Sequence, residues 1–287
     1  MRKALQAIHR TTDSHWVGDG FPVRTLFTYQ GFGAQLSPFL MLDYAGPIEF
    51  APTTKQRGVG AHPHRGFETV TIVYRGDVEH RDSSGNHGRI GPGDVQWMTA
   101  ASGILHEEMH AKDFSARGGM FEVVQLWVNL PQRFKMSPPR YQTLLDREIP
   151  LVELPDDAGS ARLIAGSHGG KQGPARTFTP INLWDLRLRA GKSASFRLTD
   201  GETTTAFVLE GKVAANDDPR VATAAELMMF DRHGEEVVLR AETDTRVLLM
   251  SGEPIDEPVV GYGPFVMNTR EEIEQAVGDM RSGNFIR

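Results

Sequence analysis

Short runs of β-branched and aromatic residues, each bounded by turn residues, constrain the fold of this chain more than any other feature. Val, Ile, Thr, Phe and Tyr favour strands, and Gly, Asn, Asp and Pro between them favour turns. In the first half these runs predict strands at 23–29, 38–44, 68–76, 94–100 and 120–130. In the second half they predict strands at 181–190, 203–211, 226–230, 236–241 and 245–252. The pattern indicates an all-β protein with two sets of strands.

A proline-rich segment separates the two sets. Three prolines and scattered charges interrupt PQRFKMSPPRYQ (131–142), and we place a domain boundary near residue 140, which gives domains 1–140 and 141–287. The length of 287 residues favours two domains over one. GFETVTIVYRGDV (66–78) and GETTTAFVLEGKV (201–213) share a strand and a Gly-x-Val turn, displaced by 135 residues. This similarity favours a duplicated barrel.

The C-terminal region predicts a single short helix. Thr269 and Glu272 have the spacing of a capping box, in which each side chain binds the other residue's backbone N–H. Four apolar residues then follow at helical spacing: Ile273, Ala276, Val277 and Met280. We expect this helix to dock against a sheet and to carry no chemistry.

The composition excludes several classes of protein and site. There is no cysteine, so any metal must bind His, carboxylate or carbonyl groups. The net charge of −6 comes from acidic and basic residues mixed along the chain, and we expect no direct binding to nucleic acid. No window approaches the roughly 18 apolar residues of a membrane span, and the first residues do not resemble a signal peptide. We therefore expect no membrane association and a cytoplasmic location.

Six of the ten histidines lie close together in the sequence, between His62 and His110. His62 and His64 are two residues apart, so on an extended segment both imidazoles leave the same face. His106 and Glu108 repeat this spacing in ILHEEM. Two adjacent strands would then each present two ligands to one point.

Three neutral imidazoles and one carboxylate suit a divalent transition metal. Iron, nickel, cobalt, manganese, zinc and copper all satisfy this donor set. Four protein ligands would leave two positions of an octahedron open for substrate and dioxygen. The alternative is that each histidine is an ordinary polar residue in a turn or a half-buried strand.

The segments HPHRGFETVTIVYRG, IGPGDVQWMTAASGILHEEM, LWVNLP and GYGPFVMNTREEI resemble the pirin family of the cupin superfamily. The resemblance implies a bicupin, with two antiparallel jelly-roll β-barrels packed together and one mononuclear metal, usually iron, in the N-terminal barrel. Carried over by position, the metal ligands are His62, His64, His106 and Glu108. Glu68 takes the place of a ligand in many other cupins, but the pirin pattern uses the later glutamate, so we expect a structural role for Glu68.

The second half does not offer a matching metal site. Counting back from Gly211 as His62 and His64 count back from Gly76 leads to Arg197 and Thr199, and an arginine does not bind a cation. We expect the second barrel to be a packing partner. His80 and His87 are expected in turns or on the surface, with a pocket mouth as the alternative for His80.

The resemblance also implies a function. Some pirins open flavonols oxidatively, so we expect a metal-dependent dioxygenase of quercetinase type whose substrates are a small aromatic polyphenol and dioxygen. Fe(2+) is the first choice of metal, and Glu108 is the expected catalytic base because it is the carboxylate beside the metal. Pirins are also described as regulators, so the alternative is a metal-dependent or redox-dependent regulator that binds a transcription factor or a metabolic enzyme.

Overall fold

The computed structural model describes residues 1–286 and divides into two compact units, each built from antiparallel sheets. The first barrel comprises Thr12–Ala34, Phe39–Asp146 and Ile255–Arg287. The second barrel comprises Met1–Thr11, Gln35–Pro38 and Arg147–Pro254. Both units are discontinuous in sequence, whereas the sequence analysis divides the chain at one position. No helix among the described residues is long and apolar enough to cross a membrane.

The first barrel contains one seven-stranded and one four-stranded sheet. The larger sheet has the order β12(Arg140–Leu144), β9(Val95–Thr99), β6(Phe67–Arg75), β11(Gly119–Asn129), β4(Phe39–Phe50), β3(Phe21–Thr28) and β2(His15–Val17). The smaller sheet has the order β5(Gly58–His64), β10(Ile104–His110), β7(Val78–Asp82) and β8(His87–Ile90). A hairpin of β25(Val260–Tyr262) and β26(Phe265–Met267) belongs to the same unit.

The second barrel repeats this arrangement strand for strand. Its larger sheet has the order β1(Leu5–Arg10), β22(Glu226–Phe230), β19(Thr203–Glu210), β24(Thr245–Gly252), β17(Ile181–Leu188), β14(Gly159–Ala165) and β13(Leu151–Glu153). Its smaller sheet has the order β18(Ser193–Arg197), β23(Glu236–Ala241), β20(Lys212–Ala215) and β21(Val221–Thr223). The second barrel also contains a hairpin of β15(Ser167–His168) and β16(Lys171–Gln172). Three short 3₁₀ turns lie elsewhere in the described chain: η1(Gln132–Phe134), η2(Asp146–Glu148) and η3(Pro155–Asp157).

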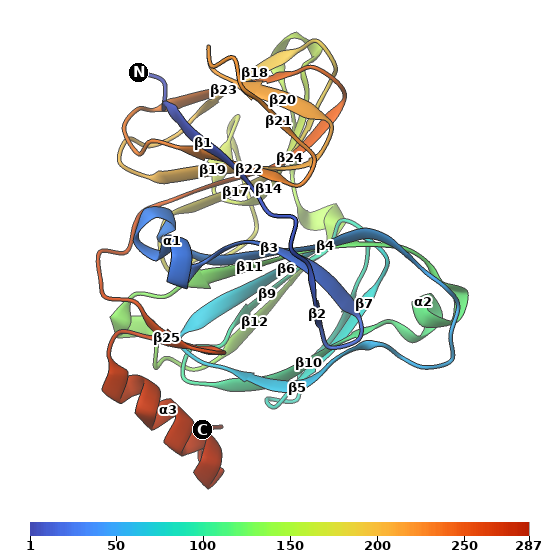
Figure 1. Cartoon of the computed structure of the whole chain (residues 1–287), viewed down its shortest axis with the longest axis vertical. Helices are drawn as coiled ribbons and strands as arrows, with labels where there is room; N and C mark the ends of the chain where they lie inside the picture. Colours follow the sequence, from blue (N-terminus) through green and yellow to red (C-terminus); the bar gives the residue numbers. More distant parts are fainter. Residues whose placement is uncertain (287) are drawn as a thin grey trace. The chain divides into compact units, whose positions relative to one another are not determined.

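The predicted all-β fold and duplicated barrel are confirmed by this repetition. The two similar segments form β6 and β19, each of which is the third strand of its seven-stranded sheet. Most residues of both strands are buried, as expected for a β-branched run in the middle of a sheet. The edge strand beside β22 was not predicted: it is β1, seen in Figure 1 as a blue strand among the late strands of the chain.

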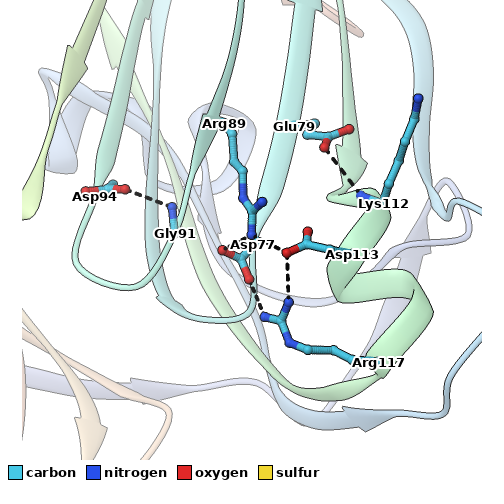
Figure 2. Close-up of polar contacts among 8 residues, drawn as sticks. All are labelled: Asp77, Glu79, Arg89, Gly91, Asp94, Lys112, Asp113 and Arg117. Atoms are coloured by element: carbon cyan, nitrogen blue, oxygen red, sulfur yellow. Dashed lines mark hydrogen bonds and ion pairs between the residues drawn. The ribbon is translucent and has the colours of Figure 1, made fainter.

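Two of the three helices lie outside the predicted set: α1(Tyr29–Leu36) and α2(Lys112–Arg117). Figure 2 shows how ion pairs anchor α2: Arg117 from the helix and Arg89 from β8 both contact Asp77 and Asp113. The Ala111 N–H also donates to the Asp77 carbonyl at 2.9 Å. These contacts hold the end of β10 against β7. The same view shows Asp94 accepting a hydrogen bond from the Gly91 N–H, which closes the turn formed by IGPGD (90–94).

The predicted C-terminal helix is α3(Arg270–Ser282), and its capping box is present: the Glu272 N–H donates to Thr269 Oγ1, and the Thr269 N–H donates to Glu272 Oε2. Ile273 and Ala276 are buried, but Met280 is 37% exposed. The buried position in the last turns is instead taken by Asp279. Helix α3 follows the β25–β26 hairpin directly, as Figure 1 shows.

Candidate metal centre

The four predicted ligands lie on two neighbouring strands, β5 and β10. The antiparallel register places His106 opposite His62 and Ile104 opposite His64. Burial alternates along β10, so that His106, Glu108 and His110 share the buried face. A β-bulge follows His106, because Glu108 is opposite Val59 and not Gly60. The period-two spacing read from the sequence therefore brings residues more than forty positions apart onto adjacent strands.

His62, His64 and His106 form a compact group. The ring centroids are 4.8 Å apart for His62 and His64, 4.3 Å for His62 and His106, and 4.9 Å for His64 and His106. One ring nitrogen from each residue lies within 4.8 Å of the others. Metal–imidazole bonds are about 2.0–2.1 Å long, so one ion between the rings is within reach after small side-chain movements.

The ring nitrogens fit a metal ion. His62 Nδ1 hydrogen-bonds to the Gly60 carbonyl at 2.9 Å, which leaves Nε2 free to coordinate. Within the described part of the chain, His64 Nδ1 and both ring nitrogens of His106 are buried without a hydrogen-bond partner. Buried polar atoms in folded proteins normally have partners, so these nitrogens fit an ion. Burial also lowers the pKa of His64 and His106 well below its usual value, so both rings are neutral, as metal binding requires.

Glu108 lies beside the histidines but is not part of the compact group found among the described residues. Its Oε1 accepts a hydrogen bond from Thr71 Oγ1 at 3.1 Å, and its Oε2 accepts one from Gln125 Nε2 at 3.5 Å. Burial raises its pKa, and the neighbouring His62 and the hydrogen bond from the Thr71 hydroxyl partly offset this rise. Glu108 is thus a buried carboxyl group held by two side chains from the facing sheet.

A cavity of about 300 Å³ opens above these residues in the first barrel. Its wall contains His62, His64 and Glu108 together with apolar side chains from the larger sheet: Val17, Phe21, Val23, Met41, Val123 and Trp127. Three further polar side chains face it: His15, Asp43 and Gln125. Asp43 accepts a hydrogen bond from Thr25 Oγ1 at 2.5 Å, and Gln125 lies opposite Asp43 on the adjacent strand. The cavity is apolar with a few polar groups, which is typical of a small-molecule site.

Comparison with known proteins places both halves of the chain in one family. The Pirin model matches residues 20–128, and the model of the Pirin C-terminal cupin domain matches residues 183–286. The chain belongs to the pirin family. The resemblance found in the sequence is therefore confirmed, and with it the two-domain cupin fold.

Several pirin relatives are similar over their full length. A Pseudomonas aeruginosa protein, provisionally named a quercetin 2,3-dioxygenase, is 57% identical over 100% of this chain and 99% of its own. A solved structure of quercetin 2,3-dioxygenase from Acinetobacter baumannii has a TM-score of 0.96 and 49% identity, covering 99% of both chains. A bacterial pirin from Escherichia coli, solved in complex with nickel(II), shares the fold at a TM-score of 0.63 and 20% identity, covering 86% of this chain and 98% of that one.

Three further titratable residues of this barrel, Glu68, His87 and His110, lie outside the compact group. Glu68 is 1% exposed and accepts a hydrogen bond from Thr99 Oγ1 at 2.6 Å, and burial raises its pKa to about 7. His110 packs among phenylalanine rings and hydrogen-bonds to the Gly20 carbonyl at 2.9 Å. His87 is exposed at the start of β8, as expected. Glu68 and His110 are therefore packed into the protein interior by contacts of their own.

The expectation that His80 lies in a turn or on the surface is wrong. His80 lies in β7, opposite Glu108 on β10, and is 2% exposed. Its ring packs on Tyr141 at a centroid distance of 4.9 Å, and burial lowers its pKa to about 4. The acidic and polar sequence EHRDS suggests a turn, but the alternation of burial along β7 turns His80 inward.

The second barrel carries apolar residues at the corresponding positions. Arg197 and Thr199, reached by counting along the sequence, are both exposed. The strand pairing assigns different counterparts, since Phe196 lies opposite Val237 as His62 lies opposite His106. Leu198 lies 13 positions before Gly211, whereas His64 lies 12 positions before Gly76, so counting along the sequence misses the counterpart by one residue. The buried counterparts of the four predicted ligands are Phe196, Leu198, Val237 and Leu239.

Proposed function

We propose that this protein is a metal-dependent dioxygenase of quercetinase type, which opens a flavonol-like ring with dioxygen and releases carbon monoxide. The observation that carries the proposal is the compact group of three imidazoles, two of which, His62 and His64, line an apolar cavity. The names of the Pseudomonas and Acinetobacter relatives support the same reaction. The first barrel, centred on the predicted domain 1–140, would carry the chemistry, and the second barrel would support it.

His62, His64 and His106 would hold the metal, with Glu108 as the fourth ligand. Fe(2+) is our first choice; nickel, cobalt, manganese, zinc and copper suit the same donors, and the E. coli pirin was solved with nickel(II). When bound, such an ion supplies a Lewis acid and open coordination positions at the base of the cavity. The neutral state of His64 and His106 keeps their nitrogens available for this role.

Glu108 would accept the proton of a substrate hydroxyl. Burial raises the pKa of Glu108 in the metal-free protein, but a carboxylate bound to a dication is a weak base, so Glu108 would accept the proton only when released from the metal. Thr71 and Gln125 contact both carboxylate oxygens and would keep Glu108 oriented toward the cavity. Glu108 is therefore proposed as ligand and as catalytic base, with the proton moving from the substrate oxygen to Glu108.

The cavity would select a flat aromatic substrate. Its apolar wall, including Trp127 and Phe21, would exclude water from the ring, and its volume of about 300 Å³ suits a small molecule. Asp43 and Gln125 could exchange hydrogen bonds with hydroxyl groups on the ring. A small polyphenol satisfies both requirements.

A direct test is to load the protein with Fe(2+), nickel or cobalt and to add quercetin in air. Wild-type protein should consume oxygen and bleach the visible band of quercetin. His106→Ala should be inactive, and Glu108→Gln should lose on the order of a hundredfold or more in kcat if general base catalysis is at work. Asp113→Ala on α2 is a matched control. Equal rates for wild type and His106→Ala would refute the proposal.

The regulator alternative uses the same histidines, so the distinction is functional. If the metal-loaded protein binds one equivalent of metal but leaves a panel of polyphenols intact, a regulatory role becomes the better proposal. Affinity capture with the metal oxidised and reduced would then test for a state-dependent protein partner.

A further inference from the structure

The backbone directly after His64 is held by the C-terminal segment of the chain. Arg65 N–H donates to the Pro264 carbonyl at 3.2 Å, and Val266 N–H donates to the Arg65 carbonyl at 3.0 Å. The His64 ring itself hydrogen-bonds to the backbone of Pro264. Gly66 has φ +92°, and a Cβ there would lie 1.9 Å from the Val266 carbonyl oxygen. Only glycine allows this close approach of the two segments.

The Arg65 side chain extends this connection to α3. It is 1% exposed, and its Nη1 donates to Asp279 Oδ2 at 2.7 Å. Its Nε donates to the Ser102 carbonyl at 2.6 Å, and its guanidinium lies over the ring of Phe285 at 4.5 Å. A buried ion pair with these additional hydrogen bonds has one favoured geometry. Arg65 therefore joins the end of β5 to α3 and to the residues after it.

Lys135 makes a second connection at the same place. Its ammonium group is buried and donates to three oxygens: the Gly66 carbonyl at 2.7 Å, Asn129 Oδ1 at 2.6 Å and the Val266 carbonyl at 2.9 Å. All three protons of the ammonium group are thereby used. Moving Val266 away from Gly66 would leave a buried charge with incomplete hydrogen bonding, which is costly.

We propose that Arg65 is a positioning residue that couples docking of residues 264–285 to the orientation of His64 and hence to metal affinity. The inference rests on the metal site proposed above. Thermodynamic linkage makes such coupling reciprocal: docking of the C-terminal segment strengthens metal binding, and metal binding stabilises the docked segment by the same factor. The C-terminal helix, expected from its sequence to be only a packing element, then contributes to the site without touching the metal.

Asp279→Asn is the most informative variant. It keeps the size of the side chain but leaves Arg65 buried without its counterion, so the docked segment should loosen and an uncompensated positive charge should remain on the strand that carries His64. We expect the affinity for cobalt or nickel, measured by chelator competition, to fall about tenfold, and the visible absorption of the bound cobalt to change. Phe285→Leu removes the ring that lies beside Arg65 and packs on Phe265, and keeps an apolar side chain there. It should show the same effects at smaller size and serves as the test if Asp279→Asn does not fold.

Asp185→Asn is a matched control. Asp185 forms a buried ion pair with Arg162 at 2.8 Å in the second barrel, so its loss measures general destabilisation by the same chemistry. Both Asn variants should lower the melting temperature of the metal-free protein, but only Asp279→Asn should weaken metal binding. In wild-type protein, added nickel should also slow amide hydrogen exchange in residues 264–285.

Two results would overturn the inference: metal affinity within twofold of wild type in folded Asp279→Asn or Phe285→Leu, or hydrogen exchange in residues 264–285 that nickel leaves unchanged. Failure of the proposed function is recognised separately, because wild-type protein would then bind no metal at the histidines.

Discussion

The two four-stranded sheets of this molecule have the same strand order but use the same interior positions for opposite purposes. In the sheet of β5, β10, β7 and β8 the inward side chains include three histidines and a glutamate. In the sheet of β18, β23, β20 and β21 the counterparts are Phe196, Leu198, Val237 and Leu239, which join one buried apolar cluster. The scaffold is therefore compatible with either a filled core or a polar site, and the side chains on two strands decide which it becomes.

The contrast between the two sheets fails if the histidines of the first barrel do not bind metal, and this test has the largest expected effect. Removing one imidazole from the three should lower metal affinity on the order of a thousandfold. We expect about one equivalent of metal in wild-type protein and nearly none in His106→Ala after the same dialysis, measured by elemental analysis. Val237→Ala, at the corresponding position of the second barrel, should retain the wild-type metal content. Equal occupancy in all three proteins would mean that the ion binds elsewhere.

Truncation of a matched pair of positions should give reciprocal phenotypes. Phe196→Ala should lower the free energy of unfolding by about 3–5 kcal/mol, because Phe196 is fully buried among apolar residues, while leaving metal binding intact. His62→Ala should cost less than about 1 kcal/mol but should weaken metal binding, since His62 is only partly buried at the cavity. Chemical denaturation and chelator competition on both variants provide the measurements. A large stability loss in His62→Ala would contradict the division of roles.

Glu68 should make the stability of the first barrel depend on pH in a way that the second barrel does not share. Its counterpart on β19 is Thr203, which does not titrate. The folded-state pKa of Glu68 is raised to about 7 by burial, so the folded protein binds more protons than the unfolded chain between pH 4.5 and pH 7. The unfolding free energy should therefore fall as pH rises through that window, by up to about 3 kcal/mol. Glu68→Gln should remove this contribution and be more stable than wild type at pH 8. Parallel pH profiles for the two proteins would contradict this assignment.

The smallest effect is expected in the pH dependence of metal retention. Burial holds the pKa of His64 and His106 well below the usual value, so protons compete little with the metal for these ring nitrogens near pH 6. The two buried rings should contribute less than about threefold to the change in nickel affinity between pH 8 and pH 6, and the affinity should fall at lower pH as these rings become protonated. Titration with a fluorescent chelator measures this. A steep loss already between pH 8 and pH 7 would contradict the neutral state of the buried rings.

Local sequence patterns predict most of the long strands of the two larger sheets, because alternation, β-branched residues and glycine turns are local signals, but they miss many of the short strands. They also predict that His62 and His64 share a face, which the β5–β10 pairing extends to His106. They fail where burial depends on the partner strand: His80 has the polar neighbours of a turn residue but faces the barrel interior. They also fail for the counterparts of the histidines, because the spacing from these positions to the later glycine differs by one residue between the barrels, and a shift of one residue exchanges the two faces of a strand. Asp279 was missed because its partner, Arg65, is 214 residues away.

The exchange of terminal segments between the barrels has a consequence for biosynthesis. Strand β1 pairs with β22, and Lys3 is buried with its ammonium group bonded to the carbonyls of Glu202 and Arg232. The histidine-bearing unit, in turn, includes residues from Ile255 onward. The ribosome synthesises the chain from its N-terminus. Each barrel therefore cannot complete its fold until a segment much later in the sequence has been made. The second barrel cannot be complete before the residues up to Pro254 are synthesised, and the histidine-bearing barrel, which also needs residues from Ile255 onward, closes last.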